Sequence, residues 1–226
     1  MVSRFVQCIA GCLILTTMFV AVGCSSGGRT QLRVLQASPD ETAINVLIDG
    51  KTLVGDVGYA TPTNYASVSD GSRHLQVEPV GSTTPVIDET VTFNRGTNST
   101  LITANAAVSI TPILLTDNTT APSSGDVQLR FVNAGLAAGD VDIYVVQPGI
   151  VPGGVPPTIG SLTFESASGY QSLTAGTYDI FVTIAGTTFA YIDAGPLTFS
   201  AGENRTFVVV SDQLGGYSLV TLSDLN

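Results

Sequence analysis

The sequence predicts an all-β protein, with two tandem immunoglobulin-like (or related) antiparallel β-sandwich domains after an N-terminal signal peptide. Three observations support this prediction. Short runs of alternating apolar and polar residues recur, glycine is abundant at 24 of 226 residues, and four sequence blocks occur twice in the same order. Alternation is typical of strands with one buried face, and short strands separated by glycine-rich turns are typical of β-sandwiches. A small β-barrel is the alternative arrangement.

Residues 1–23 predict a secretory signal peptide. Arg4 supplies a positive charge near the start, and residues 5–22 are mostly apolar. This order of regions is typical of signal peptides. The apolar run is also just long enough for a membrane-spanning helix, so an uncleaved anchor helix is an alternative.

The end of this segment indicates a lipid anchor. Residues 21–24, AVGC, resemble the lipobox of bacterial lipoproteins, although Ala21 stands where that family prefers leucine. The resemblance implies cleavage before Cys24, a diacylglycerol on its thiol and a further acyl chain such as palmitate. The two other cysteines lie inside the signal peptide, so the mature chain has no partner for a disulfide. Residues 24–30 then form a flexible tether, and the expected location is the cell envelope, lipid-anchored at the outer membrane, in the periplasm or at the cell surface.

The internal repeat predicts two domains. Its offset grows from 97 to 106 residues, because the second copy carries extra residues around 148–157. The polar segment 117–126 is rich in turn formers and reads as a linker, which gives domains at 31–120 and 121–226. The paired blocks are QLRVLQA (31–37) with QLRFVNA (128–134), AINVLIDG (43–50) with DVDIYVVQ (140–147), YASVSDGSRHLQV (65–77) with YQSLTAGTYDIFV (170–182), and VTFNRG (91–96) with LTFSAG (197–202).

Alternation places strands within these blocks. In the first unit one apolar face is formed by Ile44, Val46 and Ile48, and the second unit repeats it with Val141, Ile143 and Val145. The opposite faces differ between the copies and are expected to face solvent. Glycines that tolerate positive φ end the strands, as at Asp49-Gly50, Asp70-Gly71, Arg95-Gly96, Ala175-Gly176 and Ala201-Gly202. We expect about seven short strands per unit.

The repeated pattern resembles the bacterial "domain of unknown function 4397" family (DUF4397). The resemblance covers nearly all of residues 31–222 as two copies, and Gln36 and Asn133 stand where many members have histidine. It implies tandem β-domains and an envelope or secreted location, and it supplies no catalytic residues to carry over. The residues that carry it are LRVLQASPDETAINVLIDGKTL (32–53), VTFNRGTNSTLITA (91–104) and AGTY (175–178).

The chemistry-bearing residues predict neither a catalytic site nor a bound metal or cofactor. The net charge is −10 and the basic residues are scattered, which disfavours nucleic-acid binding. After the signal peptide the one histidine is His74, expected on an outward strand face without a catalytic partner. The acidic pairs are expected on the surface, too few to build a calcium loop. They are Asp40 with Glu41, Asp88 with Glu89, and Asp140 with Asp142.

The glycine- and proline-rich loop 150–159 distinguishes the second copy from the first, in which the equivalent connection is shorter. Loops on rigid sheets often bind ligands, and a tolerated insertion is the alternative. The candidate ligand-binding residues are Val151, Pro152, Val155, Pro156, Tyr144 and Tyr170. The leading hypothesis is a non-enzymatic envelope lipoprotein that acts in adhesion, scaffolding or assembly, with an envelope protein or glycan as partner. A glycan- or peptide-binding module is the second hypothesis, and a carboxylate-dependent hydrolase is the third.

Overall fold

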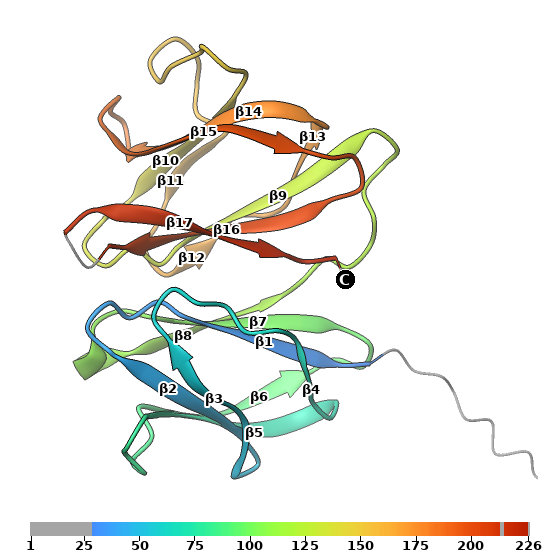
Figure 1. Ribbon diagram of the computed structural model, residues 1–226, viewed down its shortest axis with the longest axis vertical. Helices are drawn as coiled ribbons and strands as arrows, with labels where there is room; N and C mark the ends of the chain where they lie inside the picture. Colours follow the sequence, from blue (N-terminus) through green and yellow to red (C-terminus); the bar gives the residue numbers. More distant parts are fainter. Residues whose placement is uncertain (1–28, 213–214, 226) are drawn as a thin grey trace, which may run out of the picture.

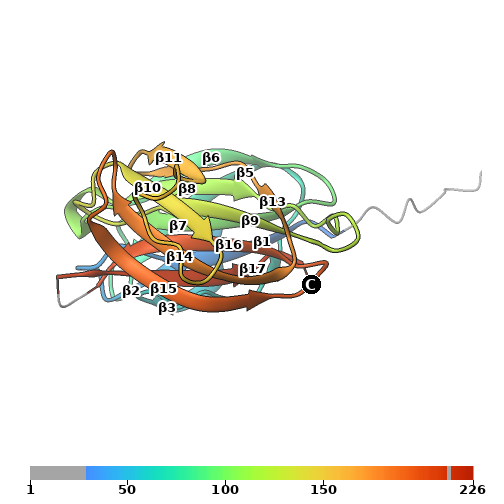
Figure 2. The same ribbon diagram turned by 90° about the horizontal axis from the view of Figure 1, so that it is seen from above.

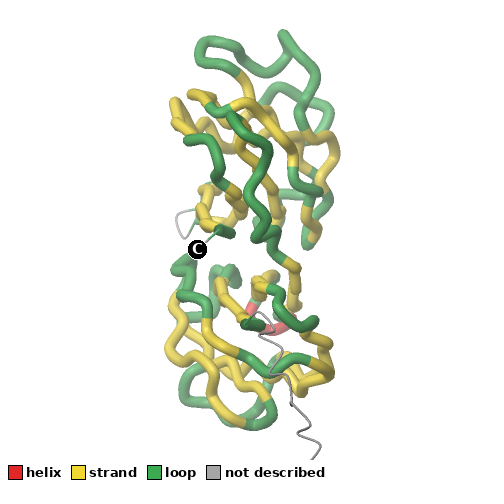
Figure 3. The backbone as a smooth tube through the Cα atoms, turned by 90° about the vertical axis from the view of Figure 1, so that its right-hand side faces the viewer, coloured by secondary structure: helices red, strands yellow, loops and turns green. Residues whose placement is uncertain are grey.

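The computed structural model describes residues 29–212 and 215–225, which form four stacked β-sheets (Figures 1 and 3). The predicted signal peptide and Cys24 lie outside the described residues. Strands β1–β8 build two sheets, here called the first sandwich, and β9–β17 build the two sheets of the second sandwich. The sheets lie over one another along the longest axis of the molecule (Figure 2). The sandwich fold is confirmed.

The first sandwich contains eight strands and one short 3-10 turn. Its inner sheet has the order β4-β1-β7-β8, and its outer sheet has the order β3-β2-β5-β6. The elements are β1 (Gln31–Gln36), β2 (Ala43–Ile48), β3 (Lys51–Gly58), β4 (Ala66–Ser67), β5 (Gly71–Pro79), β6 (Ile87–Phe93), β7 (Asn98–Ala104), η1 (Ala107–Ser109) and β8 (Thr111–Thr116).

The second sandwich contains nine strands in a similar arrangement. Its inner sheet has the order β12-β9-β16-β17 with β13 also paired to β9, and its outer sheet has the order β11-β10-β14-β15. The strands are β9 (Asp126–Asn133), β10 (Val141–Val146), β11 (Ile159–Leu162), β12 (Ser166–Ala167), β13 (Gln171–Thr174), β14 (Gly176–Ile184), β15 (Ala190–Phe199), β16 (Asn204–Ser211) and β17 (Tyr217–Ser223).

Each inner sheet contains one parallel pair, β1 with β7 and β9 with β16. The expectation of purely antiparallel sheets is therefore wrong for these pairs. No hairpin joins the two strands of either pair, so nothing forces them to run in opposite directions. The Asp49-Gly50 hairpin follows the prediction: both residues have positive φ, 51° and 74°, as a type I′ turn requires. Gly176 differs from the prediction, because it is the first residue of β14 and does not have positive φ.

Three apolar layers hold the four sheets together. Two of them fill the sandwiches, around Ile44 and Leu75 in the first and around Ile143 and Phe207 in the second. The third lies between the inner sheets of the two sandwiches. It contains Leu35, Ala37, Ile102, Ala104, Ile113, Val132, Ala134, Val208, Val210 and Leu222. The inner sheets are thus buried on both faces, and the two sandwiches form one continuous body.

Candidate functional site

A buried group of four charges lies between the two inner sheets. Arg33 of β1 reaches Asp224, which follows β17 of the second sandwich, at 2.7 Å. Arg130 of β9 reaches Asp117, which follows β8 of the first sandwich, at 2.5 Å. All four side chains are at most 5% exposed. We call these residues the interface quartet. These two ion pairs join the two sandwiches, and Arg33 also lies 3.8 Å from Asp117 of its own sandwich.

The quartet has approximate twofold symmetry, because the main contacts of Arg33 have counterparts at Arg130. Each guanidinium donates through Nε to a threonine of its own sandwich and through NH1 to a backbone carbonyl of the other. The threonine contacts are Arg33 to Thr100 at 3.2 Å and Arg130 to Thr206 at 2.9 Å. The carbonyl contacts are Arg33 to Ser223 at 2.6 Å and Arg130 to Thr116 at 3.0 Å.

Two tyrosines complete the arrangement. The hydroxyl of Tyr65 donates to Asp117 at 2.7 Å, and that of Tyr170 donates to Asp224 at 2.8 Å. Each ring also stacks on an arginine, with the guanidinium carbon of Arg33 4.6 Å from the Tyr65 centroid and that of Arg130 4.7 Å from the Tyr170 centroid. Cation–π contacts and charge-assisted hydrogen bonds stabilise the buried charges together.

Burial raises the pKa of both tyrosines well above the usual value. For Tyr65 the negative charge of Asp117 raises the pKa further. For Tyr170 the charge of Arg130 opposes the effect of burial on the pKa, and Asp224 adds to it. Both hydroxyls therefore stay protonated at neutral pH and remain donors to the carboxylates.

The quartet is suited to fixing the two sandwiches relative to each other. Its two positive and two negative charges cancel, so it offers no net charge to an ionic ligand. Buried ion pairs need their whole hydrogen-bond shell to offset the loss of hydration, and both carboxylates here accept bonds from an arginine, a threonine and a tyrosine.

The sequence did not predict the interface quartet. Asp117 lies in the segment between β8 and β9, within the predicted linker, but its side chain is completely buried beside Arg130. This burial was not expected, because it depends on the neighbouring sandwich that covers Asp117. The signal was present: an arginine occupies the same place in both QLR blocks, between two apolar residues of a strand. An arginine in such a place needs a buried carboxylate.

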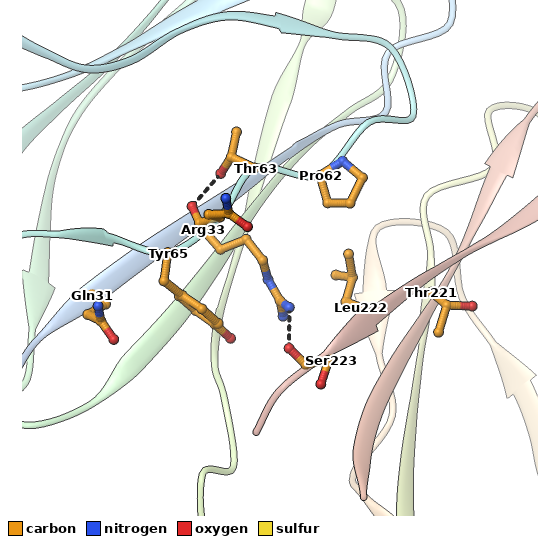
Figure 4. A pocket seen from close by; sticks show the side chains of 9 residues that line it. Gln31, Arg33, Pro62, Thr63, Tyr65, Thr221, Leu222 and Ser223 are labelled. Atoms are coloured by element: carbon orange, nitrogen blue, oxygen red, sulfur yellow. Dashed lines mark hydrogen bonds between the residues drawn. The ribbon is translucent and has the colours of Figure 1, made fainter. Parts of the chain in front are cut away.

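A groove of about 390 Å³ opens at the surface beside Arg33 (Figure 4). Gln31, segment 62–65 and residues 221–223 of β17 line it, so both sandwiches contribute. In Figure 4 Arg33 extends across the groove towards Ser223, and the Tyr65 ring lies beside the guanidinium. The groove is thus a polar cleft whose floor is held in place by the interface quartet.

The predicted ligand-binding residues fall into two separate places. The candidate loop joins β10 to β11 and lies on the outer sheet of the second sandwich. Val155 packs against Tyr144 and its neighbours on that sheet, while Val151 is 61% exposed. Tyr170, by contrast, lies at the interface between the sandwiches, where its hydroxyl donates to Asp224 of the interface quartet. The structure therefore brings Tyr144 to the loop but not Tyr170.

The loop also changes the outward face of β10. This face was expected to be open to solvent, but Asp142 and Tyr144 are each 5% exposed and Val146 is 9% exposed. The surface expectation for Asp142 is wrong, because its carboxylate accepts backbone N–H groups from Ser161 and Gly186. The neighbouring loops cover the strand and supply these donors.

His74 lies on the outer sheet of the first sandwich, as expected, with its side chain 45% exposed. Its Nε2 lies 2.5 Å from Asp88, a partner that was not expected, and the hydrogen bond lowers the pKa of that carboxyl group.

Across the described ranges, no three histidine, cysteine or acidic side chains gather closely enough to hold a metal ion. No helix in the same part of the chain is long and apolar enough to cross a membrane.

Comparisons with solved structures gave distant likenesses. The carbohydrate-binding module CBMbc (family CBM26) from Eubacterium rectale Amy13K, solved with maltoheptaose, is 10% identical and has a TM-score of 0.29, with 84% of this chain and 95% of that chain covered. The pneumococcal glycogen-degrading virulence factor SpuA is 8% identical with a TM-score of 0.26; 84% of this chain covers only 23% of that protein. These TM-scores are too low to indicate a shared function.

A third solved structure is that of a proposed cell adhesion protein from Bacteroides fragilis NCTC 9343. It is 9% identical with a TM-score of 0.21, over 86% of this chain and 97% of that chain. Among curated proteins, no sequence matches this one.

The family comparison is firmer: residues 30–144, about half of the chain, match the model described as "Domain of unknown function (DUF4397)". The chain therefore belongs to the DUF4397 family.

Proposed function

We propose that this protein is a non-enzymatic cell-envelope lipoprotein whose two sandwiches act as one rigid unit in adhesion or scaffolding. The observation that carries the proposal is the interface quartet, which joins the sandwiches through buried ion pairs in both directions. If the two sandwiches moved freely relative to each other, these four residues would be exposed to solvent. Water would then hydrate their charges, and they would not need hydrogen-bond partners in the protein.

Two further features support rigidity. The apolar layer between the inner sheets contains ten buried residues, and separating the sandwiches would expose them to water. The linker is also held in place, because the side-chain amide of Asn204 donates to the carbonyl oxygens of Asn118 and Thr120. A rigid body of two sandwiches transmits force and holds the surfaces of the two sandwiches in a fixed arrangement.

In-cell crosslinking of the tagged full-length protein, followed by mass spectrometry, tests the proposal. Co-purification of one defined envelope protein or surface polysaccharide supports an adhesive or scaffolding role. Turnover of a defined envelope substrate by the purified protein, abolished by a single carboxylate substitution, contradicts it.

The lipid anchor is tested separately at Cys24. Cys24→Ala should release the protein from membranes or leave its signal peptide uncleaved, since the thiol is the proposed attachment point. Cys12→Ala is the matched control, because this cysteine lies in the segment that is cut away, and the protein should stay in the membrane fraction. Mature, membrane-bound Cys24→Ala protein would refute lipidation there.

A second candidate function is ligand binding at the tip of the second sandwich. Val151 is 61% exposed and Phe189 is 64% exposed. The loop that carries Val151 lies against the loop that carries Phe189. At Gly153 the two loops are so close that an added Cβ atom would lie 2.9 Å from the side chain of Thr188. Exposed apolar side chains on adjoining loops favour contact with a glycan or peptide. Binding that survives Val151→Ser and Phe189→Ser together would exclude this tip.

A further inference from the structure

We propose that the free edge of β17 pairs with β17 of a second copy of this chain, in an antiparallel register centred on Leu219. The pairing places a twofold axis at Leu219 and joins the inner sheets of two second sandwiches into one continuous sheet. The inference goes beyond the proposed function and does not depend on it, since it concerns self-association through an edge that the interface quartet leaves open.

β17 is the last strand of its sheet, and half of its backbone groups point away from β16 (Figure 1). Just beyond the end of β17, the backbone N–H of Asp224 donates to the carbonyl of Asn204. Bonds to the neighbouring strand recur at every second residue of an antiparallel pair, so the even-numbered residues of β17 bond to β16. The backbone groups of the odd-numbered residues point outward instead. These residues are Tyr217, Leu219, Thr221 and Ser223.

Three of the outward residues have no backbone partner. The carbonyl of Ser223 accepts Arg33 at 2.6 Å, which closes the edge at that end. Within the part of the chain that the structure describes, no hydrogen bond from the protein reaches the backbone N–H or carbonyl of Tyr217, Leu219 or Thr221. The edge therefore offers three donors and three acceptors, placed symmetrically about Leu219.

The equivalent edge of the first sandwich is closed by a proline. β8 is the counterpart of β17, because the carbonyl groups of Thr116 and Ser223 each accept an arginine of the other sandwich. Pro112 lies four residues before Thr116, and Leu219 lies four residues before Ser223. A proline has no N–H and its ring blocks the outer side of the strand, so β8 cannot be extended there. The same position of β17 carries a free N–H.

The other long edge strands are protected by charged residues. Charges, prolines and irregular pairing all prevent edge strands from adding a further strand. β3 contains Lys51 and Asp56 and pairs with β2 through shifts of register, β6 contains Asp88 and Glu89, and β15 contains Asp193. The seven residues of β17 include no charge and no proline, and they pair with β16 without a shift.

A second copy fits this edge because the free groups are their own complement. When two β17 edges meet antiparallel with their Leu219 residues opposite each other, Tyr217 of each copy faces Thr221 of the other. This register forms six N–H···O bonds and pairs every free group on both edges. A register shifted by two residues leaves some of them unpaired, since the carbonyl of Ser223 is already taken.

The side chains also suit a pair of identical strands. The chain carries a net charge of −10, so two copies repel each other at most surfaces, but paired β17 strands bring no charged side chains together. Tyr217 and Leu219 pack on the core of the second sandwich and are only partly buried. Pairing places one leucine against the other and removes more of their apolar surface from water.

The test is sedimentation equilibrium of residues 24–226 with Cys24→Ser, which keeps both sandwiches and removes the proposed lipid attachment point. At about 0.15 M salt, which screens the net charge, the average mass should rise towards that of a dimer as the concentration approaches about 1 mM. Leu219→Pro gives β17 the protection that β8 has. It should weaken association about tenfold or more, because two of the six bonds lose their donors while the bonds to β16 remain.

Leu219→Lys and Leu219→Glu give a second test that depends on the register. Each variant alone places like charges opposite each other at the axis and should weaken association, whereas an equimolar mixture pairs opposite charges and should restore it. Leu114→Lys is the matched control, because Leu114 is also a partly buried leucine of an edge strand, β8. It should leave association unchanged, and thermal unfolding checks that each variant is folded.

A protein that stays monomeric up to about 1 mM would overturn the proposal. Association that persists in Leu219→Pro would also overturn it, as would equal weakening by Leu219→Lys and Leu114→Lys. A mixture of Leu219→Lys and Leu219→Glu that associates no more than either variant alone would show that the two strands do not meet at Leu219.

Discussion

The two sandwiches are nearly equivalent where they meet and different where they do not. At the shared face, the arginine, threonine, tyrosine and aspartate of each half of the interface quartet have counterparts with similar partners in the other half. At the outer faces the equivalence ends. Asn45 and Leu47 on β2 are partly exposed, whereas Tyr144 and Val146 in the matching strand β10 are buried.

The difference follows from where each residue finds its partner. Asp117 and Asp224 each bind an arginine of the other sandwich, so a change in one copy leaves a buried charge in the other. The outer sheets have no such reciprocal partner. The second sandwich carries the additional loop after β10, and Val155 from that loop covers Tyr144, Val146 and Phe181. A symmetric interface restricts both copies together, while a free face can change in one copy alone.

The largest effect is expected at the interface quartet. Asp117→Ala should lower the free energy of unfolding by about 3–5 kcal/mol, because it leaves Arg130 buried without its carboxylate. Asp224→Ala should have a similar effect, because it leaves Arg33 buried without its carboxylate in the equivalent geometry. Urea unfolding of both variants measures this directly.

The control is Asp70→Ala, which removes a surface partner of Arg95. Both side chains of that pair are about half exposed or more, so stability should change by less than about 0.5 kcal/mol. A large loss for Asp117→Ala with a negligible loss for Asp224→Ala would show that the two halves of the quartet are not equivalent.

A smaller effect is expected in the apolar layer between the sandwiches. Leu35 is fully buried there, and Leu35→Ala should cost about 2–4 kcal/mol through lost contacts and a remaining cavity. Val108→Ala, at a side chain that is 94% exposed, should leave the unfolding midpoint unchanged. A Leu35→Ala variant as stable as wild type would indicate that this layer does not hold the sandwiches together.

The quartet's tyrosines predict sensitivity to alkaline pH. The folded pKa values of Tyr65 and Tyr170 lie above the unfolded value of about 10, so their contribution to stability is fully present below pH 10. It is lost as pH rises further, by about 1.4 kcal/mol per pH unit for each tyrosine, because only the unfolded chain releases the proton.

Urea unfolding between pH 8 and 11.5 measures this loss. Tyr65→Phe with Tyr170→Phe should flatten the decline above pH 10, while each change costs about 1–2 kcal/mol at neutral pH through its lost hydrogen bond. An equally steep decline in the double variant would mean that other groups control the alkaline transition.

Much of the fold could be predicted from the sequence, because strands with one buried face leave an alternating pattern. The alternation at Ile44, Val46 and Ile48 placed β2 correctly. The interface could not be predicted in this way, since β7 is buried on both faces and retains polar residues such as Asn98 and Thr100. Their burial depends on a second sandwich that sequence periodicity does not reveal. The repeated arginine was the available signal, and it indicates a partner without locating it.

The smallest effect separates two residues of the β10–β11 loop, and it tests why the outer faces differ. Val155 packs on Tyr144, Val146 and Phe181, whereas Val151 is 61% exposed. Val155→Ala should cost about 1 kcal/mol, and Val151→Ala should cost almost nothing. Thermal unfolding of the two variants compares the same substitution at two positions of one loop. Equal stability would mean that the loop does not cover the outer sheet, and the burial of Tyr144 would then need another cause. A loss confined to Val155→Ala would show that the loop is anchored at one residue while Val151 stays free to contact a ligand.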